Sequence, residues 1–390
     1  DQKRGLRSAV IYAMFVPDSF VPQTRSEVNP STAAIPSLLR AIEPRPSDRL
    51  ELIFITANGK LSRRSTPYRR QEIAQQIGYF WLTNSDIQNP QSFDQFSREL
   101  QQWLFAPIQA ELQAAKINGL MYVLDQGLRS LPLASMHNGQ TSLLQDYTVS
   151  VIPSLGMLDR RQTPLQNQTT LAMGASKFQQ LVPLPAVPQE LKMIQQQGFS
   201  GQHFLNESFT LANVVQQKRQ KRPGILHLAT HADFNIGQPQ NSFIQLWDQR
   251  LTLDQIDRLK LRDTDLELLI LSACNTATGD PVAELGFTGM ASLFGVRTAL
   301  GSLWSISDLG TFAFMSEFYG HLAQSPSRVD ALRQAQLAMR QGKVRTDNGK
   351  LVTSQGKRLD LPEFLDASLR DGDFSHPYYW SGFTMVGNPW

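Results

Sequence analysis

The chain has 390 residues, 41% hydrophobic and 18% charged, and its 37 basic and 34 acidic residues give a formal net charge of +3. This composition is typical of a folded globular protein, and its near-balance of charge gives no reason to expect nucleic-acid binding. No apolar run reaches the ~20 residues of a membrane helix, and there is no signal-peptide pattern. The single cysteine excludes internal disulfides and cysteine-cluster metal sites and agrees with a reducing cytosol. We therefore expect a cytoplasmic protein.

Short apolar runs alternate with helical patterns along the chain, which is typical of an α/β fold with a mostly parallel sheet. In the first half, the predicted strands are Ala9–Phe15, Leu50–Thr56, Leu120–Leu124 and Tyr147–Ile152. Apolar residues at three- and four-residue spacing predict helices over Tyr68–Leu82 and Ser92–Lys116. The polar, Gln-rich stretch Asp159–Thr170 reads as a connector, and it divides the chain into predicted α/β units of residues 1–165 and 166–390.

The second half repeats the alternation. The predicted strands are Leu171–Gly174, Gly224–Thr230, Ile244–Leu246, Leu266–Ala273, Thr298–Ser305 and one within residues 376–387. The predicted helices are Gln189–Gln197, Leu211–Lys218, Leu253–Leu259, Glu284–Phe294, Gly310–Leu322 and Arg328–Arg340. The polar stretch Gln341–Phe374 is expected to be a surface insertion.

The cysteine and one histidine each follow an apolar strand. Cys274 comes after the strand Leu266–Ala273, and His231 comes after the strand Gly224–Thr230. Such continuously apolar strands are typical of the centre of a sheet, and functional groups gather at the carboxyl ends of parallel strands. If the two strands are neighbours, thiol and imidazole emerge at one rim, as nucleophilic cysteine catalysis requires. The alternatives are a buried structural cysteine and a hydrogen-bonded structural histidine, and His227 is interpreted as the latter.

Several ordered motifs carry a family resemblance. LHLATHADF, LLILSACNTATGD, LGSLWSISDLGTFAFMSEFY and HPYYWSGFTMVGNPW, together with VLDQGLRSLPLASM and SVIPSL, resemble the CHAT domain. This is a caspase-like cysteine peptidase domain that is usually carried behind tetratricopeptide repeats and is common in cyanobacteria. The resemblance implies a caspase-like (clan CD) fold, a mostly parallel sheet flanked by helices, with a pseudo-protease-like N-terminal half. It also implies that repeats precede Asp1 in a longer protein.

The resemblance assigns His231 and Cys274 as the catalytic dyad, 43 residues apart where caspases have about 50. It further implies an oxyanion hole made by the backbone N–H groups of Ala232 and Cys274. Family members usually have glycine where this chain has Ala232. Alanine would be strained there if the backbone required a positive φ.

An acidic residue is the candidate for substrate selection. In the related metacaspases and separases, an aspartate after the equivalent strand lines the pocket for a basic residue, and Asp308 stands at the matching place here. The alternative is that Asp308 caps the helix that begins near Gly310. Asp233 and Glu284 are further candidates for the rim of this pocket.

We therefore expect an intracellular cysteine endopeptidase that cleaves a protein or peptide after Arg or Lys and is controlled by a partner through upstream repeats. One alternative is a catalytically weak or inactive CHAT module that acts as a regulatory protein-interaction domain, with Ala232 as an early sign of decay. Another is a thiol amidotransferase or hydrolase acting on a small molecule, which fits the Cys and His but not the other motifs. No metal, cofactor, nucleic acid or membrane partner is expected, because ligand clusters and phosphate-binding glycine loops are not found.

Overall fold

The computed structural model describes residues 6–17, 44–83, 89–159, 161–233, 242–263, 266–272, 295–361 and 372–390. Cys274, Glu284 and the helix predicted over Glu284–Phe294 lie outside these ranges. Within them, no helix combines the length and the apolar character needed to cross a membrane.

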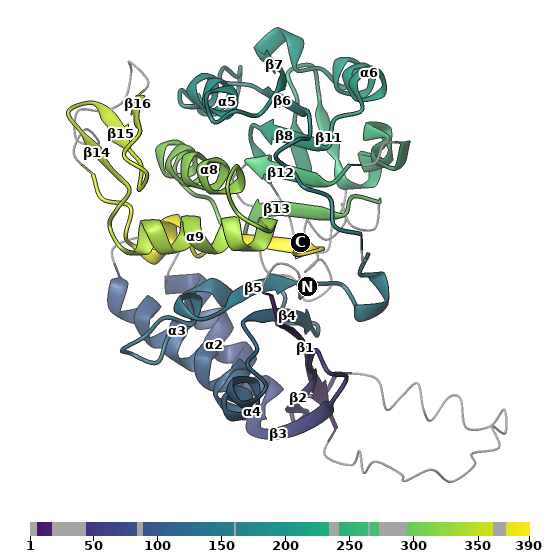
Figure 1. The fold of residues 1–390 in the computed structure, drawn as a ribbon, viewed down its shortest axis with the longest axis vertical. Helices are drawn as coiled ribbons and strands as arrows, with labels where there is room; N and C mark the ends of the chain where they lie inside the picture. The colour runs from purple at the N-terminus through teal and green to yellow at the C-terminus, as the bar shows by residue number, and fades with distance from the viewer. Residues whose placement is uncertain are drawn as a thin grey trace, which may run out of the picture.

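One large sheet runs through the molecule (Figure 1). In the described part of the chain it has eleven strands: β1 Ser8–Val16, β2 Arg49–Ile55, β3 Leu61–Arg69, β4 Gly119–Leu124, β5 Thr148–Val151, β6 Thr170–Gly174, β7 Gly201–Leu205, β8 Ile225–Ala229, β12 Leu268–Ser272, β13 Thr298–Ser302 and β17 Phe383–Gly387. Their order is β3-β2-β1-β4-β5-β17-β13-β12-β8-β6-β7. The expectation of a mostly parallel sheet is confirmed.

The sheet consists of two parallel blocks that run in opposite directions, and β2 and β3 extend the first block as an antiparallel edge. Strands β1, β4, β5 and β17 are parallel neighbours, and so are β13, β12, β8, β6 and β7. The blocks meet where β17 pairs antiparallel with β13. The carboxyl ends of the two blocks therefore lie at opposite edges of the sheet, and those of β13, β12, β8 and β6 share one rim.

Helices cover both faces of the second block. The helices are α5 Val187–Gln196, α6 Leu211–Lys221, α8 Asp308–Leu322 and α9 Arg328–Arg340. Figure 1 shows α5 and α8 on one side of the strands and α6 on the other. Strand β8 alternates accordingly: Ile225 and Ala229 pack in the core with α8, whereas Leu226 and Leu228 pack in the core with α6. This two-sided burial explains why the strand is apolar at every position except His227.

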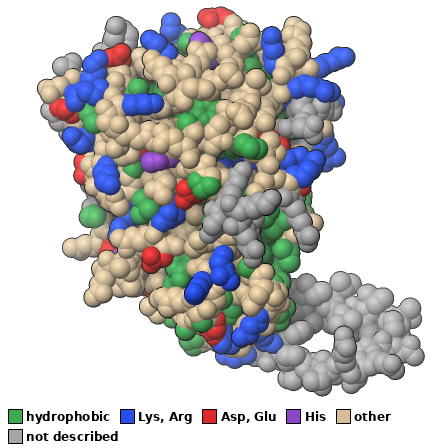
Figure 2. All heavy atoms as spheres, viewed as in Figure 1, with side chains coloured by type: hydrophobic (Ala, Val, Ile, Leu, Met, Phe, Trp, Pro, Cys, Tyr) green, Lys and Arg blue, Asp and Glu red, His purple; other side chains and the backbone are tan. Residues whose placement is uncertain are grey.

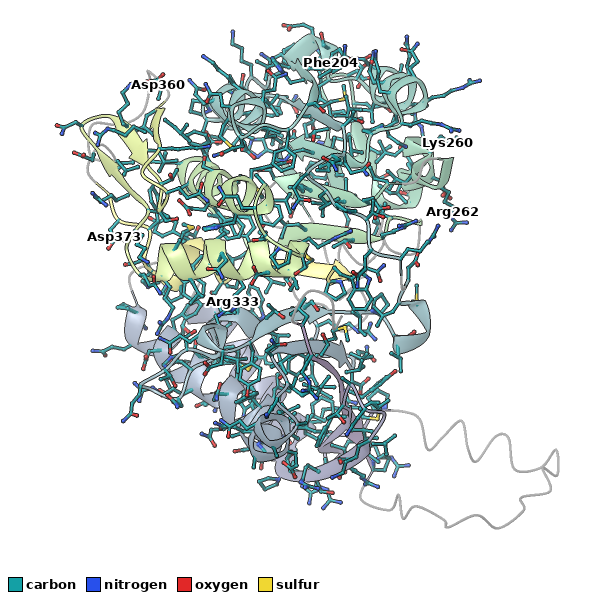
Figure 3. The ribbon with its side chains drawn as sticks, in the orientation of Figure 1. Phe204, Lys260, Arg262, Arg333, Asp360 and Asp373 are labelled. Carbon is teal, nitrogen blue, oxygen red and sulfur yellow. The ribbon has the colours of Figure 1, made fainter. Side chains whose placement is uncertain are left out.

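The first block has its own helices, which are α2 Arg70–Thr83, α3 Pro90–Leu104 and α4 Gln109–Ala114. Helix α9 joins this half to the second one. Its Arg333 lies at the border between them (Figure 3) and donates to the carbonyl oxygens of Leu144 and Gln145 at 2.6 and 2.5 Å. The continuous sheet and this contact make the two halves one body.

The structure adds strands where the sequence predicts none. Residues 61–69, LSRRSTPYR, form the edge strand β3, and residues 201–205 form the opposite edge strand β7. Edge strands commonly carry polar and charged residues, so they do not form the apolar runs from which strands are predicted. Two small sheets also form. One consists of β9 Ala232–Asp233, β10 Phe243–Gln245 and β11 Arg250–Thr252, and of these the sequence predicts β10, over Ile244–Leu246. The other consists of β14 Arg345–Asp347, β15 Lys350–Val352 and β16 Arg358–Asp360. The second lies within the predicted insertion.

The visible surface shows no single-sign patch. On the face in Figure 2, Lys and Arg side chains are scattered among acidic and neutral ones. This agrees with the small net charge of the sequence.

Candidate functional site

The rim of the second block aligns the strands that lead to His231 and Cys274. Strands β8 and β12 are parallel neighbours, with Ala229 opposite Ser272. Past this pair, the N–H of Thr230 donates to the carbonyl oxygen of Ser272 at 3.2 Å. His231 follows Ala229 by two residues, and Cys274 follows Ser272 by two residues. The expected adjacency of the two strands is therefore confirmed, while the position of the thiol itself stays a prediction.

The imidazole of His231 is held by a backbone carbonyl. Its Nε2 lies 2.7 Å from the carbonyl oxygen of Val182, and the ring of Phe178 packs edge-on against it with centroids 4.7 Å apart. Because a carbonyl oxygen only accepts, Nε2 carries a proton in this contact, and in the neutral ring Nδ1 is then the acceptor. An imidazole with one nitrogen anchored and the other unprotonated has the form that a general base needs.

The backbone at Ala232 is not strained. Ala232 lies in β9, and it is not among the residues with positive φ. Gln245 N donates to the carbonyl of His231 at 2.8 Å, which makes Ala232 and Ile244 a non-hydrogen-bonded pair in the β9–β10 ladder. The N–H of Ala232 therefore points away from β10, and it has no hydrogen-bond partner among the described residues. Alanine replaces glycine here without a conformational cost.

Asp308 is the first residue of α8 and does not cap it. The cap is Ser307, whose Oγ accepts from the N–H of Gly310 at 3.1 Å, so the alternative that Asp308 caps this helix is wrong. The Asp308 Oδ2 instead accepts from the N–H of Ala186 at 2.6 Å. Burial and, to a smaller extent, the nearby Glu190 raise the pKa of this carboxyl to about 7, against the lowering effect of the Ala186 hydrogen bond.

One loop touches both His231 and Asp308. The segment between β6 and α5 contacts the imidazole through Phe178 and Val182, and it reaches Asp308 through Ala186. His231 and Asp308 come from strands β8 and β13, which β12 separates. The loop therefore follows the rim from one candidate residue to the other.

A buried polar cluster lies beneath this rim. The Oε1 of Glu190, on α5, accepts from Ser272 Oγ at 2.5 Å and lies 2.9 Å from Nε2 of His227, a contact that is close but not aligned as a hydrogen bond. Nδ1 of His227 is 3.1 Å from the hydroxyl of Tyr319, and burial raises the pKa of that hydroxyl. All four residues are at least 96% buried. The cluster ties α5 to the last residue of β12 and to the middle of β8.

The remaining candidates are less informative. Asp233 lies half-buried in β9 opposite Phe243, and Glu284 falls outside the described ranges. In the part of the chain that the structure describes, no three His, Cys, Asp or Glu side chains group closely enough to hold a metal ion.

Sequence reasoning missed the residues that support the candidate dyad. The carbonyl of Val182 leaves no trace in the sequence, because every residue has a carbonyl group. Glu190 could be noticed only as an acidic residue on the apolar face of a helix, since Leu191 and Ile194 beside it are also buried.

Comparison with known proteins agrees with this architecture. The family model of the CHAT domain matches residues 94–388. No curated protein matches the chain. The separase chain in the Saccharomyces cerevisiae separase–securin complex is 11% identical and superposes with a TM-score of 0.54, covering 99% of this chain and 30% of that one. Gingipain R, an Arg-specific cysteine proteinase, is 10% identical with a TM-score of 0.45, covering 76% and 67% of the two chains. The chain thus spans about 30% of the separase chain's length and has its caspase-like cysteine peptidase fold.

Proposed function

Because the chain belongs to the CHAT domain family, we propose that it is a cysteine endopeptidase with His231 and Cys274 as its dyad. The observation that carries the proposal is the anchored imidazole of His231, whose Nε2 is bonded to Val182 and whose Nδ1 is left as an acceptor. The alignment of β8 and β12 supports a thiol within reach of that nitrogen, since each residue follows the paired strand ends by two positions.

In the proposed reaction, Nδ1 of His231 accepts the proton of the Cys274 thiol, and the thiolate attacks the carbonyl carbon of the peptide bond. The resulting oxyanion accepts from the N–H of Ala232, which has no other partner in the described residues, and from the N–H of Cys274. The imidazolium then protonates the leaving amine, and a thioester remains. Water, deprotonated by His231, releases the carboxylic acid product and restores the thiol.

We propose that the substrate is a protein or peptide cut after Arg or Lys. Asp308 supports this choice because one of its oxygens is committed to Ala186 and the other has no partner among the described residues. A half-buried carboxylate with a free oxygen can form a charge-assisted pair with a guanidinium or ammonium group. Control of the enzyme by a protein partner bound to tetratricopeptide repeats is part of the same proposal.

The experiment compares wild type with Cys274→Ala and His231→Ala on a peptide library and with an active-site-directed thiol probe. Both variants should lose turnover by at least about 1000-fold while unfolding as wild type does, and probe labelling at neutral pH should fall in His231→Ala. Val182→Ala is the control: its side chain is 74% exposed and only its carbonyl bonds His231, so turnover should stay unchanged. Turnover near the wild-type rate in either dyad variant contradicts the proposal, and a folded wild type with neither turnover nor labelling indicates an interaction module.

A further inference from the structure

A pocket of about 570 Å³ is lined by residues that contact His231, among them Phe178 and Gln245. One wall is the segment Lys177–Leu181, which follows β6, and the other consists of residues 245–250 of β10, β11 and their turn. Both walls contact His231: the Phe178 ring packs against the imidazole, and the N–H of Gln245 donates to the His231 carbonyl. The pocket is thus attached to the proposed general base but is not part of the site described above.

The order of strands places this pocket along the path of a substrate. Across the rim, β13 leads to Asp308, β12 toward Cys274, β8 to His231 and β6 to Lys177 (Figure 1). If the basic residue before the cut lies at Asp308, the scissile bond lies between β12 and β8. His231 protonates the leaving amine, so the chain that follows the cut continues past His231. That direction leads to the pocket, and this step rests on the proposed function.

The charges that line the pocket favour an acidic occupant. Lys177 is exposed and has no partner in the described residues. Arg250 stacks on Phe243 at 4.4 Å and bonds Gln245 Oε1, so its position is fixed. The carboxylate of Asp248 is already engaged by the N–H of Leu211 and by the side chain of Gln249. The described lining therefore carries two cations and one carboxylate, a net charge of +1, and the carboxylate is already hydrogen-bonded to Leu211 and Gln249.

We propose that this pocket binds the peptide segment after the cleaved bond and selects an acidic side chain there. Trp247 adds an aromatic surface against which such a segment can pack. The volume is ample for two or three side chains of an extended peptide, and small-ligand sites of 300–1,000 Å³ are common. The subsite would make cleavage depend on residues on both sides of the cut.

The test uses internally quenched peptides that are identical through the Arg before the cut and carry Glu, Gln or Lys at each of the three positions after it. Wild type should cleave the best Glu peptide about 3- to 10-fold faster in kcat/KM than its Lys counterpart, as expected for one partly exposed ion pair. Lys177→Glu should remove or reverse this preference, mainly through KM. Lys60→Glu is the matched control, since it makes the same charge change on an exposed residue of the β2–β3 turn. Equal cleavage of the Glu, Gln and Lys peptides, or the same effect in both variants, overturns the proposal.

Two further measurements separate this proposal from the one that it rests on. An arginyl aminocoumarin amide has no peptide segment after the cut, so its hydrolysis should be unchanged in Lys177→Glu. Binding of a fluorescein-labelled acidic tripeptide, matching the segment after the cut, is measured with Cys274→Ala protein. Weaker binding in a Cys274→Ala, Lys177→Glu double variant supports the pocket, and unchanged binding overturns it. Failure of wild type to cleave any substrate overturns the proposed function, and the tripeptide measurement still decides the pocket.

Discussion

Asp308 combines a half-buried position with a pKa raised to near neutral pH. Its pKa is raised from 3.8 to about 7, first by burial and then by the proximity of Glu190. Between these two pH values the folded protein keeps the proton while the unfolded chain has lost it. The folded state therefore binds more protons, and the free energy of unfolding contributed by Asp308 falls as pH rises from about 4 to about 7.

The first prediction follows from this difference. Asp308→Asn should be less sensitive to pH than wild type, because the amide does not ionise. Urea unfolding of both proteins at pH 5 and pH 8 measures it: the wild type should lose more stability than the variant on going to pH 8. Equal losses in both proteins would mean that Asp308 titrates near its ordinary pKa.

The preference for a basic residue before the cut should rise with pH, whereas the stability contributed by Asp308 falls. A neutral Asp308 cannot pair with a guanidinium group, so the ratio of kcat/KM for an Arg peptide to that for a matched Met peptide should rise from pH 6 to pH 8. The dyad acts on both substrates, and its own titration cancels from the ratio. In Asp308→Asn the ratio should not change with pH. It should also be ~30- to 1,000-fold lower than in wild type, which corresponds to about 2–4 kcal/mol. A ratio that is independent of pH in wild type contradicts the proposed role of Asp308.

At the scale of elements, α5 is fastened to the sheet by a charged group rather than by apolar packing alone. Glu190 is 1% exposed and reaches both Ser272 at the end of β12 and His227 in β8. A buried carboxylate is stable only when such partners surround it. This contact fixes the spacing of the two strands that lead to the candidate dyad.

Replacement of Glu190 should therefore be costly. Glu190→Ala should lower the free energy of unfolding by about 3–5 kcal/mol, because Ser272 and His227 lose their buried partner. Gln196→Ala is the control on the same helix: the side chain is exposed, and the change should stay within about 0.5 kcal/mol. Chemical unfolding measures both variants. A Glu190→Ala variant as stable as Gln196→Ala would show that the cluster contributes nothing to the fold.

At the scale of the whole molecule, two oppositely directed blocks behave as one sheet because β17 and α9 span them. Strand β17 comes from the C-terminal end of the chain but pairs parallel with β5 and antiparallel with β13. Helix α9 packs against α8 and reaches β5, and its Arg333 binds two carbonyl oxygens of the first half. The halves are expected to unfold together.

Arg333→Ala tests this coupling. Loss of two charge-assisted hydrogen bonds should lower the free energy of unfolding by about 1.5–3 kcal/mol. Arg340→Ala is the matched control, because Arg340 lies on the same helix and makes no hydrogen bond or ion pair with the described residues. Differential scanning calorimetry should show a single transition in wild type and in Arg340→Ala. An Arg333→Ala protein with the wild-type transition would show that the sheet alone couples the halves.

The sequence predicts the central strands and the helices that cover them. The apolar runs over β4, β8, β12 and β13 are recognisable because burial on two faces leaves few polar positions. It also determined that Cys274 and His231 follow such runs, since chain order fixes what comes after a strand. The CHAT motifs lie in these same segments, and the family model bears out the resemblance. The edge strands β3 and β7 were not predicted, because exposed, polar strands do not form an apolar run.

Which side chains and backbone groups lie together at the rim of the second block depends on the tertiary fold. Strand pairing joins residues far apart in the chain, so no local pattern could show that the two blocks run in opposite directions or that Ala229 faces Ser272. The imidazole of His231 is held by a backbone carbonyl 49 residues away in the chain. Every residue has such a carbonyl, so the sequence could not indicate which one binds the histidine. Asp308 likewise has a pKa raised to about 7 because the fold buries its carboxyl and brings Glu190 near it, against the lowering effect of the Ala186 hydrogen bond. Such surroundings are set by the tertiary fold and have no local pattern in the sequence.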